Sequence, residues 1–244
     1  MEPRDRPIRI GFLVPPGAPT VEVEMIAAAP RPVSVHFTRL VARGPAGTHQ
    51  GQEERNRSQI EHLPECAALL AMVKPRVIVL AHTATSGTMG KDAEAAMVAR
   101  IERETGIPFI TAFGSVVAAL AHLGAKRIAL GTPYAADTTE TTKKNLEAHG
   151  LEVASVARLE NVKNIYEETA ARARELARKA DSAPAQAVFL SGVGMPTLDA
   201  LEGIEADLGK PAVSSAAAML WNALRVAGVI EPVSGCGSLL AGRR

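Results

Sequence analysis

The stretch RIGFLVPP at residues 9–16 has a counterpart in RIALGTPY at residues 127–134, and this pair indicates how the chain is built. Each is a short apolar run that ends in a proline turn, which is typical of a buried strand followed by a loop. Further along, VIVLAHTATSGTMG at 77–90 corresponds to AVFLSGVGM at 187–195. In both halves the second match is again an apolar run, here followed by a loop of small residues.

A third match relates 106–124 to 209–228, where each half has a Gly-x-Pro strand and a short helix that ends in glycine. The matches occur in the same order, which favours a true duplication over the general similarity of all parallel α/β chains. We predict an α/β fold of two pseudo-two-fold-related parallel-sheet lobes with helices on both faces. The first lobe is expected to comprise residues 1–115 and 215–244, and the second residues 116–214.

Apolar runs rich in β-branched residues alternate with helix-length segments that carry apolar residues on one face. The strands are expected at Arg9–Val14, Val33–Leu40, Arg76–Ala81, Pro108–Ala112, Arg127–Gly131, Glu152–Arg158, Ala187–Ser191 and Pro211–Ser214. The helices are expected at Glu53–Val73, Lys91–Thr105, Ser115–Leu123, Ala136–Ala148, Ile165–Lys179, Met195–Leu208 and Ala216–Ala227. Ligands of such sheets bind beyond the carboxyl ends of the strands, so the two third-strand loops are expected to face one cleft.

Composition and charge exclude several classes of protein. The 244 residues carry 27 Lys and Arg against 26 Asp and Glu, a net charge of +1 that argues against nucleic acid as a partner. No apolar run approaches the roughly 20 residues of a membrane helix, and Met1–Arg9 lacks the apolar core of a signal peptide. We therefore expect a cytoplasmic protein with no membrane partner. The sequence does not decide its oligomeric state, and a homo-oligomer is possible.

Metal and nucleotide sites have no motif in this sequence. Cys66 and Cys236 lie far apart without a CxxC partner, and the six histidines show no metal-ligand spacing. Neither the glycine-rich dinucleotide motif nor a P-loop occurs. We expect no metal and no cofactor.

Two loops carry the candidate chemistry. The hydroxyl-rich loop Ala84-Thr85-Ser86-Gly87-Thr88 follows a predicted buried strand and leads toward a helix, where an anion is favoured, although such hydroxyls often serve only as helix caps. The loop Ser191-Gly192-Val193-Gly194 can present backbone N–H groups to an oxyanion, although a turn with two glycines can also be merely tight.

Two further side chains lie near these loops in the predicted topology. Tyr134, one of two tyrosines, follows the first strand of the second half and can donate a hydrogen bond to a carboxylate, or simply pack. His82 precedes the hydroxyl-rich loop and is either a proton donor or a hydrogen-bonded structural residue.

Over nearly the whole chain the sequence resembles the aspartate/glutamate racemase superfamily, in particular its maleate cis-trans isomerase and arylmalonate decarboxylase branch. The resemblance rests on IGFLVPP at 10–16 with TVEVEM at 20–25, VLAHTATSGT at 79–88 and GTPY at 131–134. Its most specific block is FLSGVGMPTLDALEGIEADLGKPAVSSAAAMLWNALRVAG at 189–228. The resemblance implies two α/β lobes that enclose a small carboxylate substrate without a cofactor.

The resemblance also assigns site positions. It places the first catalytic cysteine of the family at Ala84, the second at Gly192, and the carboxylate-binding tyrosine at Tyr134. The maleate isomerases have an asparagine where this chain has Ala18. Substrate-binding residues are then expected to be Pro15, Pro16, Ala84, Thr85, Ser86, Tyr134, Gly192 and Val193, with Ser86, Tyr134 and His82 as candidate catalytic residues.

The absence of both cysteines from these positions narrows the reactions that the resemblance implies. Covalent addition to an alkene loses its nucleophile, and two-base racemisation loses both bases. Decarboxylation of a malonate-type acid demands least, because it needs mainly a stabilised enediolate and a dry pocket for the departing carboxylate. We expect a lyase of this kind; the alternatives are a maleate-like isomerase or racemase with a non-thiol proton route, and a noncatalytic carboxylate-binding protein.

Overall fold

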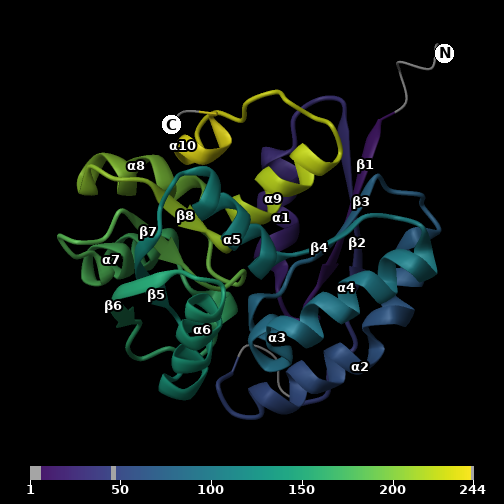
Figure 1. Cartoon of the computed structure of the whole chain (residues 1–244), viewed down its shortest axis with the longest axis horizontal. Coiled ribbons are helices and arrows are strands. Elements are labelled where there is room, and N and C mark those ends of the chain that lie inside the picture. The colour runs from purple at the N-terminus through teal and green to yellow at the C-terminus, as the bar shows by residue number, and fades with distance from the viewer. Residues whose placement is uncertain (1–6, 45–47, 243–244) are drawn as a thin grey trace.

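The computed structural model describes residues 7–44 and 48–242. The expectation that Met1–Arg9 is not a signal peptide falls largely on Met1 to Arg6, which lie outside the described residues. Figure 1 shows two lobes, each built on one sheet. The first has the strand order β2-β1-β3-β4 and the second β6-β5-β7-β8. The strands are β1 (Ile8–Val14), β2 (Val33–Arg39), β3 (Val77–Leu80), β4 (Phe109–Thr111), β5 (Arg127–Thr132), β6 (Glu152–Arg158), β7 (Ala187–Leu190) and β8 (Ala212–Ser214).

All strand pairs in both sheets are parallel, and the two sheets share one connectivity. The helices are α1 (Pro19–Ala28), α2 (Gln52–Ala71), α3 (Thr83–Met89), α4 (Lys91–Thr105), α5 (Ala112–His122), α6 (Ala136–Ala148), α7 (Ala170–Ala180), α8 (Leu198–Leu208), α9 (Ser215–Val226) and α10 (Gly237–Leu240), with a 3₁₀ turn, η2, at Ile165–Glu167. The predicted fold class, two parallel-sheet lobes with helices on both faces, is confirmed.

The first strand of each lobe, β1 or β5, has a glycine at the point where a helix packs closely against it. A Cβ on Gly11 of β1 would lie 2.8 Å from Cδ2 of Leu70 on α2, and a Cβ on Gly131 of β5 would lie 2.9 Å from Cγ of Leu176 on α7. Since real side chains do not approach so closely, glycine lets the helix leucine pack directly on the central strand. The duplicated sequence thus has a packing reason in both lobes.

Helices α5 and α9 pack against each other at the centre of the molecule (Figure 1). Val116 and Leu120 of α5 lie in a core cluster with Ile128 and Phe189 of the second sheet. Each helix starts directly after the last strand of a sheet, where Thr111 accepts a hydrogen bond from the N–H of Gly114, and Ser214, in the equivalent place, one from Ala217. This centre brings the carboxyl ends of both sheets together.

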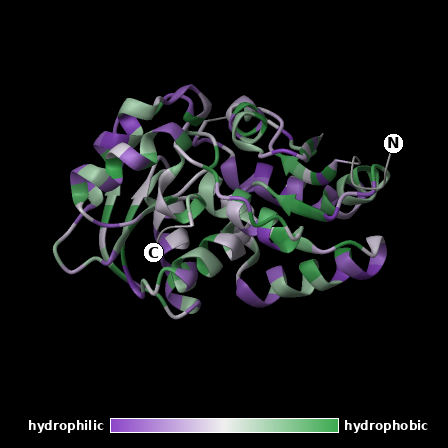
Figure 2. Ribbon diagram, turned by 90° about the horizontal axis from the view of Figure 1, so that it is seen from above, coloured by the Kyte–Doolittle hydropathy of each residue, from purple (hydrophilic) through white to green (hydrophobic). Residues whose placement is uncertain are grey.

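Hydrophobic residues, green in Figure 2, fill the strands and the inner sides of the helices, while hydrophilic residues are common on the outer helices. The strands β3 and β7 are buried along their whole length, as their continuous apolar runs predict. No helix of the described residues is both long and apolar enough to cross a membrane. The lobe boundaries at 115/116 and 214/215 stay a prediction.

Three segments differ from the expected elements. Helix α1 was not predicted, because its apolar and acidic residues alternate with little helical periodicity in PTVEVEM. The segment 165–179, expected as one helix, begins with the separate turn η2, and Thr169 caps α7 after it. The hydroxyl-rich segment expected to be a loop is the helix α3, which changes where its side chains point.

Candidate functional site

The candidate site lies where the segments after β3, β5, β7 and β8 converge. Ala84, Tyr134 and Ile165 form one small buried cluster, with Tyr166 packed against it. Ala84 comes from α3 of the first lobe, while Tyr134, Ile165 and Tyr166 come from the second lobe. The structure therefore brings the position of the first family cysteine and the candidate tyrosine together across the lobes.

Tyr134 also lies against Gly192, to which the resemblance assigns the second family cysteine. A Cβ on Gly192 would lie 3.1 Å from the phenol oxygen of Tyr134, and the backbone there has φ of +100°. Tyr134 is 1% exposed. Burial raises the pKa of its phenol, so the group keeps its proton at neutral pH and serves as a hydrogen-bond donor. Ala84, Tyr134 and Gly192 thus share one site.

Two hydroxyl residues that the sequence analysis did not select complete this centre. The phenol of Tyr134 is hydrogen-bonded to Thr83, whose hydroxyl donates to Oγ of Ser215 over 3.3 Å. Ser215 Oγ in turn accepts the backbone N–H of Gly192 over 3.2 Å. We call these four residues the hydroxyl network. The Ser-Ser pair at 214–215 was a signal for Ser215, but its equivalent in the first half is Ala112, so the repeat gave no reason to select it.

The hydroxyls of Thr85 and Ser86 point to other partners. Thr85 donates to the carbonyl of His82 over 2.8 Å, within its own turn. Ser86 donates to Oε1 of the buried Glu94 on α4 over 2.5 Å. Because successive residues of a helix are about 100° apart, the hydroxyls of α3 cannot all face one ligand. The structure therefore does not join Thr85 and Ser86 to the hydroxyl network through their side chains.

His82 is buried directly before α3, and its Nδ1 has no hydrogen-bond partner among the described residues. Burial, with a smaller effect of the nearby Arg55 guanidinium, lowers the pKa of His82 to about 4. The imidazole is therefore neutral at neutral pH in the unliganded protein. It becomes a better proton donor only if an anion binds nearby and stabilises the imidazolium.

The remaining predicted residues line the same end of the sheets. Val193 is buried beside Gly192. The carbonyls of Pro15 and Pro16 accept hydrogen bonds from Arg39 over 3.3 and 3.0 Å, which ties the loop after β1 to the end of β2. No described contact joins these prolines to the hydroxyl network.

A cavity of about 830 Å³ opens between α2, α3 and α6 and reaches Ala84. Its lining includes the polar residues Gln52, Asn56, Thr88 and Thr138, and both lobes contribute to it. Ala84 therefore lies both in the wall of this cavity and in the buried cluster with Tyr134.

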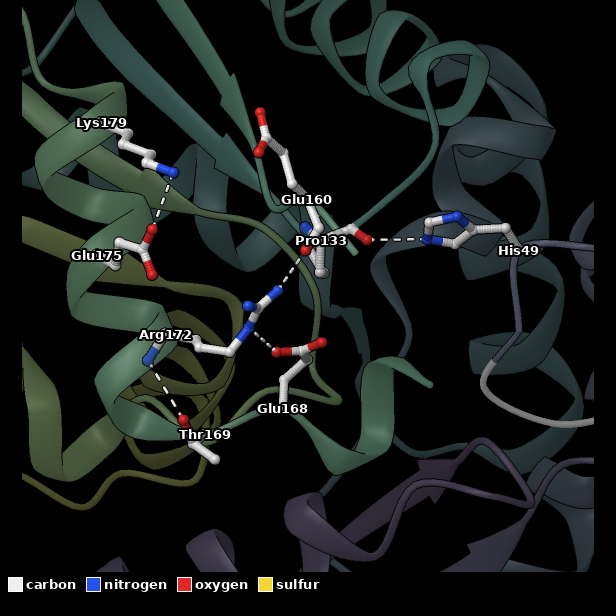
Figure 3. Close-up of polar contacts among 8 residues, drawn as sticks. All are labelled: His49, Pro133, Glu160, Glu168, Thr169, Arg172, Glu175 and Lys179. Atoms are coloured by element: carbon white, nitrogen blue, oxygen red, sulfur yellow. Dashed lines mark hydrogen bonds and ion pairs between the residues drawn. The ribbon is translucent and has the colours of Figure 1, made fainter. Parts of the chain in front are cut away.

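Two sets of contacts position segments of the second lobe near the site (Figure 3). His49 of the first lobe donates from Nε2 to the carbonyl of Pro133, beside Tyr134, over 3.0 Å. Arg172 of α7 donates to the carbonyl of Glu160 over 2.6 Å and pairs with Glu168. These bonds fix the segment between β6 and α7, which carries Ile165 and Tyr166 to the site.

Both cysteines lie outside the candidate site. Cys66 is in α2, where its thiol donates to the carbonyl of Arg39, and Cys236 caps α10. Burial raises the pKa of the Cys66 thiol, and burial together with nearby carboxylates raises that of Cys236 to about 11. Neither thiol is activated as a nucleophile. Among the described residues, His, Cys, Asp and Glu form no group of three suited to a metal ion.

Comparison with known proteins identifies relatives that span the chain. The profile of the arylmalonate decarboxylase family matches residues 10–240. A maleate isomerase of Nocardia farcinica is 30% identical over 95% of both chains, and an arylmalonate decarboxylase of Bordetella bronchiseptica is 29% identical over 90% of both. The crystal structure of a maleate isomerase from Pseudomonas putida S16 with maleate superposes with a TM-score of 0.89 at 25% identity, covering 97% of this chain and 98% of that one.

Proposed function

This chain belongs to the arylmalonate decarboxylase family, and on that premise we propose that it is a cofactor-independent enzyme acting on the carbon next to a carboxylate of a small mono- or dicarboxylic acid. The relatives named above are enzymes of two reaction types, decarboxylation and cis-trans isomerisation. Of these, we propose decarboxylation of a malonate-type acid. The reaction class is thus a lyase that works through an enediolate.

The observation that supports this proposal is the packing of a protonated phenol against the backbone of a glycine inside a buried site. Tyr134 and Gly192 lie together, and neither brings a charge that a bound carboxylate would have to displace. The phenol of Tyr134 and the N–H of Gly192 can both donate to an oxyanion once the hydrogen bond from Gly192 to Ser215 is broken. Donors that are held in place before the reaction stabilise negative charge where it develops, and one such donor is worth about 10²- to 10³-fold in rate.

Loss of carbon dioxide then follows from this arrangement. The bond between the α-carbon and the departing carboxylate breaks, and its electron pair moves into the retained carboxylate, which becomes an enediolate. Tyr134 and the N–H groups of Gly192 and Val193 hold the enediolate oxygens. A proton then adds to the α-carbon, from His82 or from a bound water. The pKa of His82, about 4 in the unliganded protein, makes His82 a donor only when substrate anions lie beside it.

Isomerisation is the second candidate, because the superposed maleate isomerase shares the fold over nearly the whole chain. It is weaker, since Ala84 and Gly192 stand where the resemblance places the thiols and the two cysteines of this chain lie elsewhere. A protein that binds small carboxylates without turnover is the third candidate.

The test is incubation with phenylmalonate, methylmalonate and maleate in deuterium oxide, followed by NMR and by measurement of released carbon dioxide. Decarboxylation is supported by carbon dioxide release with one deuteron at the α-carbon of the product. Formation of fumarate from maleate replaces this proposal with isomerisation. Binding of these acids with neither deuterium uptake, carbon dioxide nor fumarate refutes an enzymatic function on this class.

A further inference from the structure

Arg55 is a buried cation beside the candidate site. It lies in the first turn of α2 and is 6% exposed. Its guanidinium donates to the carbonyl of Gln50 over 2.6 Å and to the carbonyl of Thr48. Within residues 7–44 and 48–242, no carboxylate lies within ion-pairing distance of it. Its charge therefore has no counterion there.

Two neighbours of Arg55 lie at the cavity that reaches the candidate site. Gln52 and Asn56, in the same turns of α2, line the cavity that reaches Ala84. The amide of Asn56 donates to Oγ1 of Thr88 over 3.0 Å and lies 3.5 Å from the carbonyl of Ala84. Arg55 is thus anchored on the helix turn that contacts α3.

The charge of Arg55 shifts the pKa values of residues in both lobes. It acts electrostatically on His82 of the first lobe and on Tyr166 of the second. Tyr166 covers the loop after β7, since a Cβ on Gly194 would lie 2.6 Å from its ring. The unpartnered Nδ1 of the buried His82 is a second polar group without a ligand in this region.

A buried charge without a counterion is costly, and a guanidinium has five N–H donors in a fork that matches a carboxylate. The two carbonyls of Thr48 and Gln50 use only part of this capacity. Arg55 can therefore hold its loop and still bind an anion.

We propose that Arg55 determines substrate specificity by binding a second carboxylate, one carried on the side chain of the substrate. This inference rests on the proposed function, in which Tyr134 and Gly192 hold the reacting carboxylate. A guanidinium stabilises an ionised carboxylate more than it stabilises carbon dioxide, so the carboxylate at Arg55 is not the one that departs. The preferred substrate is then an acid with an anionic side chain over an acid with an aryl or alkyl side chain.

The test compares succinate and butyrate, which have the same four-carbon chain and differ in one carboxylate. Their dissociation constants are measured by calorimetry for the unaltered protein, Arg55→Met and Arg55→Lys. The unaltered protein should prefer succinate, and Arg55→Met should weaken succinate binding about 10- to 100-fold while changing butyrate binding less than about 2-fold. Arg55→Lys should keep part of the preference, since it keeps the charge.

Arg100→Met is the matched control, because it removes a cation from an exposed ion pair with Glu104 on α4. It should leave both constants unchanged. If Arg55→Met weakens the binding of succinate and butyrate equally, Arg55 only positions its loop and the inference is wrong. The inference is also wrong if the unaltered protein binds butyrate as tightly as succinate. In either case carbon dioxide release from malonates can still support the proposed function. If the unaltered protein binds neither acid, the inference fails, while carbon dioxide release from malonates still tests the proposed function separately.

Discussion

Gly192 lies so close to Tyr134 that a Cβ added to the glycine would stand 3.1 Å from the phenol oxygen. The two residues come from the segments after β7 and β5, which are neighbouring parallel strands. The phenol of Tyr134 therefore packs against the backbone of Gly192, whose N–H donates to Ser215. The proposed chemistry of this site depends on that pair.

Replacing Tyr134 by Phe removes the phenol donor but keeps the ring that fills the cluster with Ala84 and Ile165. We expect the turnover of any substrate found to fall about 10²- to 10³-fold, since one oxyanion donor is lost. The melting temperature should change little. Ser155→Ala, which removes a hydroxyl bonded to Ala180 and Ser182 away from the site, is the control and should keep full activity. Unchanged turnover in Tyr134→Phe would remove Tyr134 from the mechanism.

Replacing Gly192 by Cys restores a thiol at the position that the resemblance assigns to the second family cysteine. The φ of +100° disfavours any side chain there, so the free energy of unfolding should fall by about 1–3 kcal/mol. Gly192→Ala carries the same strain without the thiol. Urea unfolding should show a similar loss in both variants, and only the Cys variant should gain racemisation or faster decarboxylation. A gain of activity in the Ala variant as well would contradict a role for the thiol.

Replacing Ser86 by Ala should destabilise the protein, because the buried Glu94 loses a donor at 2.5 Å. An unsatisfied buried group costs about 1–3 kcal/mol. In a Glu94→Ala background the same substitution should cost much less, which a double-mutant cycle of unfolding free energies measures. A direct role in substrate binding would instead lower affinity with little change in stability, and that result would favour the interpretation made from the sequence alone.

The buried His82 should make stability depend on pH. Its pKa is about 4 in the folded protein against 6.5 when unperturbed, so the unfolded chain takes up the proton first. The contribution of neutral His82 to the free energy of unfolding is complete above pH 6.5. It is lost as the pH falls from 6.5 to 4, by about 1.4 kcal/mol for each unit by which the two pKa values differ. Urea unfolding between pH 7 and 5 should show a shallower decline for His82→Gln than for the unaltered protein. Parallel declines would mean that His82 is not buried as a neutral group.

Much of the fold could be predicted from sequence because its signals are local. Continuous apolar runs at β3 and β7 and the glycines at 11 and 131 report burial and close packing directly. Helix α3 could not be predicted in this way, because TATSGTM lacks an apolar face and contains a glycine, and its helical state depends on its buried position after β3.

The site was predictable in its positions but less so in its contacts. Tyr134, Ala84 and Gly192 meet as expected, since all follow strand ends. The partner of Ser86 could not be foreseen, because Glu94 belongs to another helix whose placement is set by tertiary packing. Ser215 was missed because its equivalent in the first half, Ala112, has no hydroxyl. Arg55 was missed because the sequence does not encode how near its helix lies to His82.

The most direct test is a crystal structure of the protein with malonate bound. We expect one carboxylate within hydrogen-bonding distance of both the Tyr134 hydroxyl and the Gly192 backbone N–H, with the Ser215 hydroxyl turned away from Gly192. Malonate bound elsewhere, with the bond from Gly192 to Ser215 intact, would contradict the account.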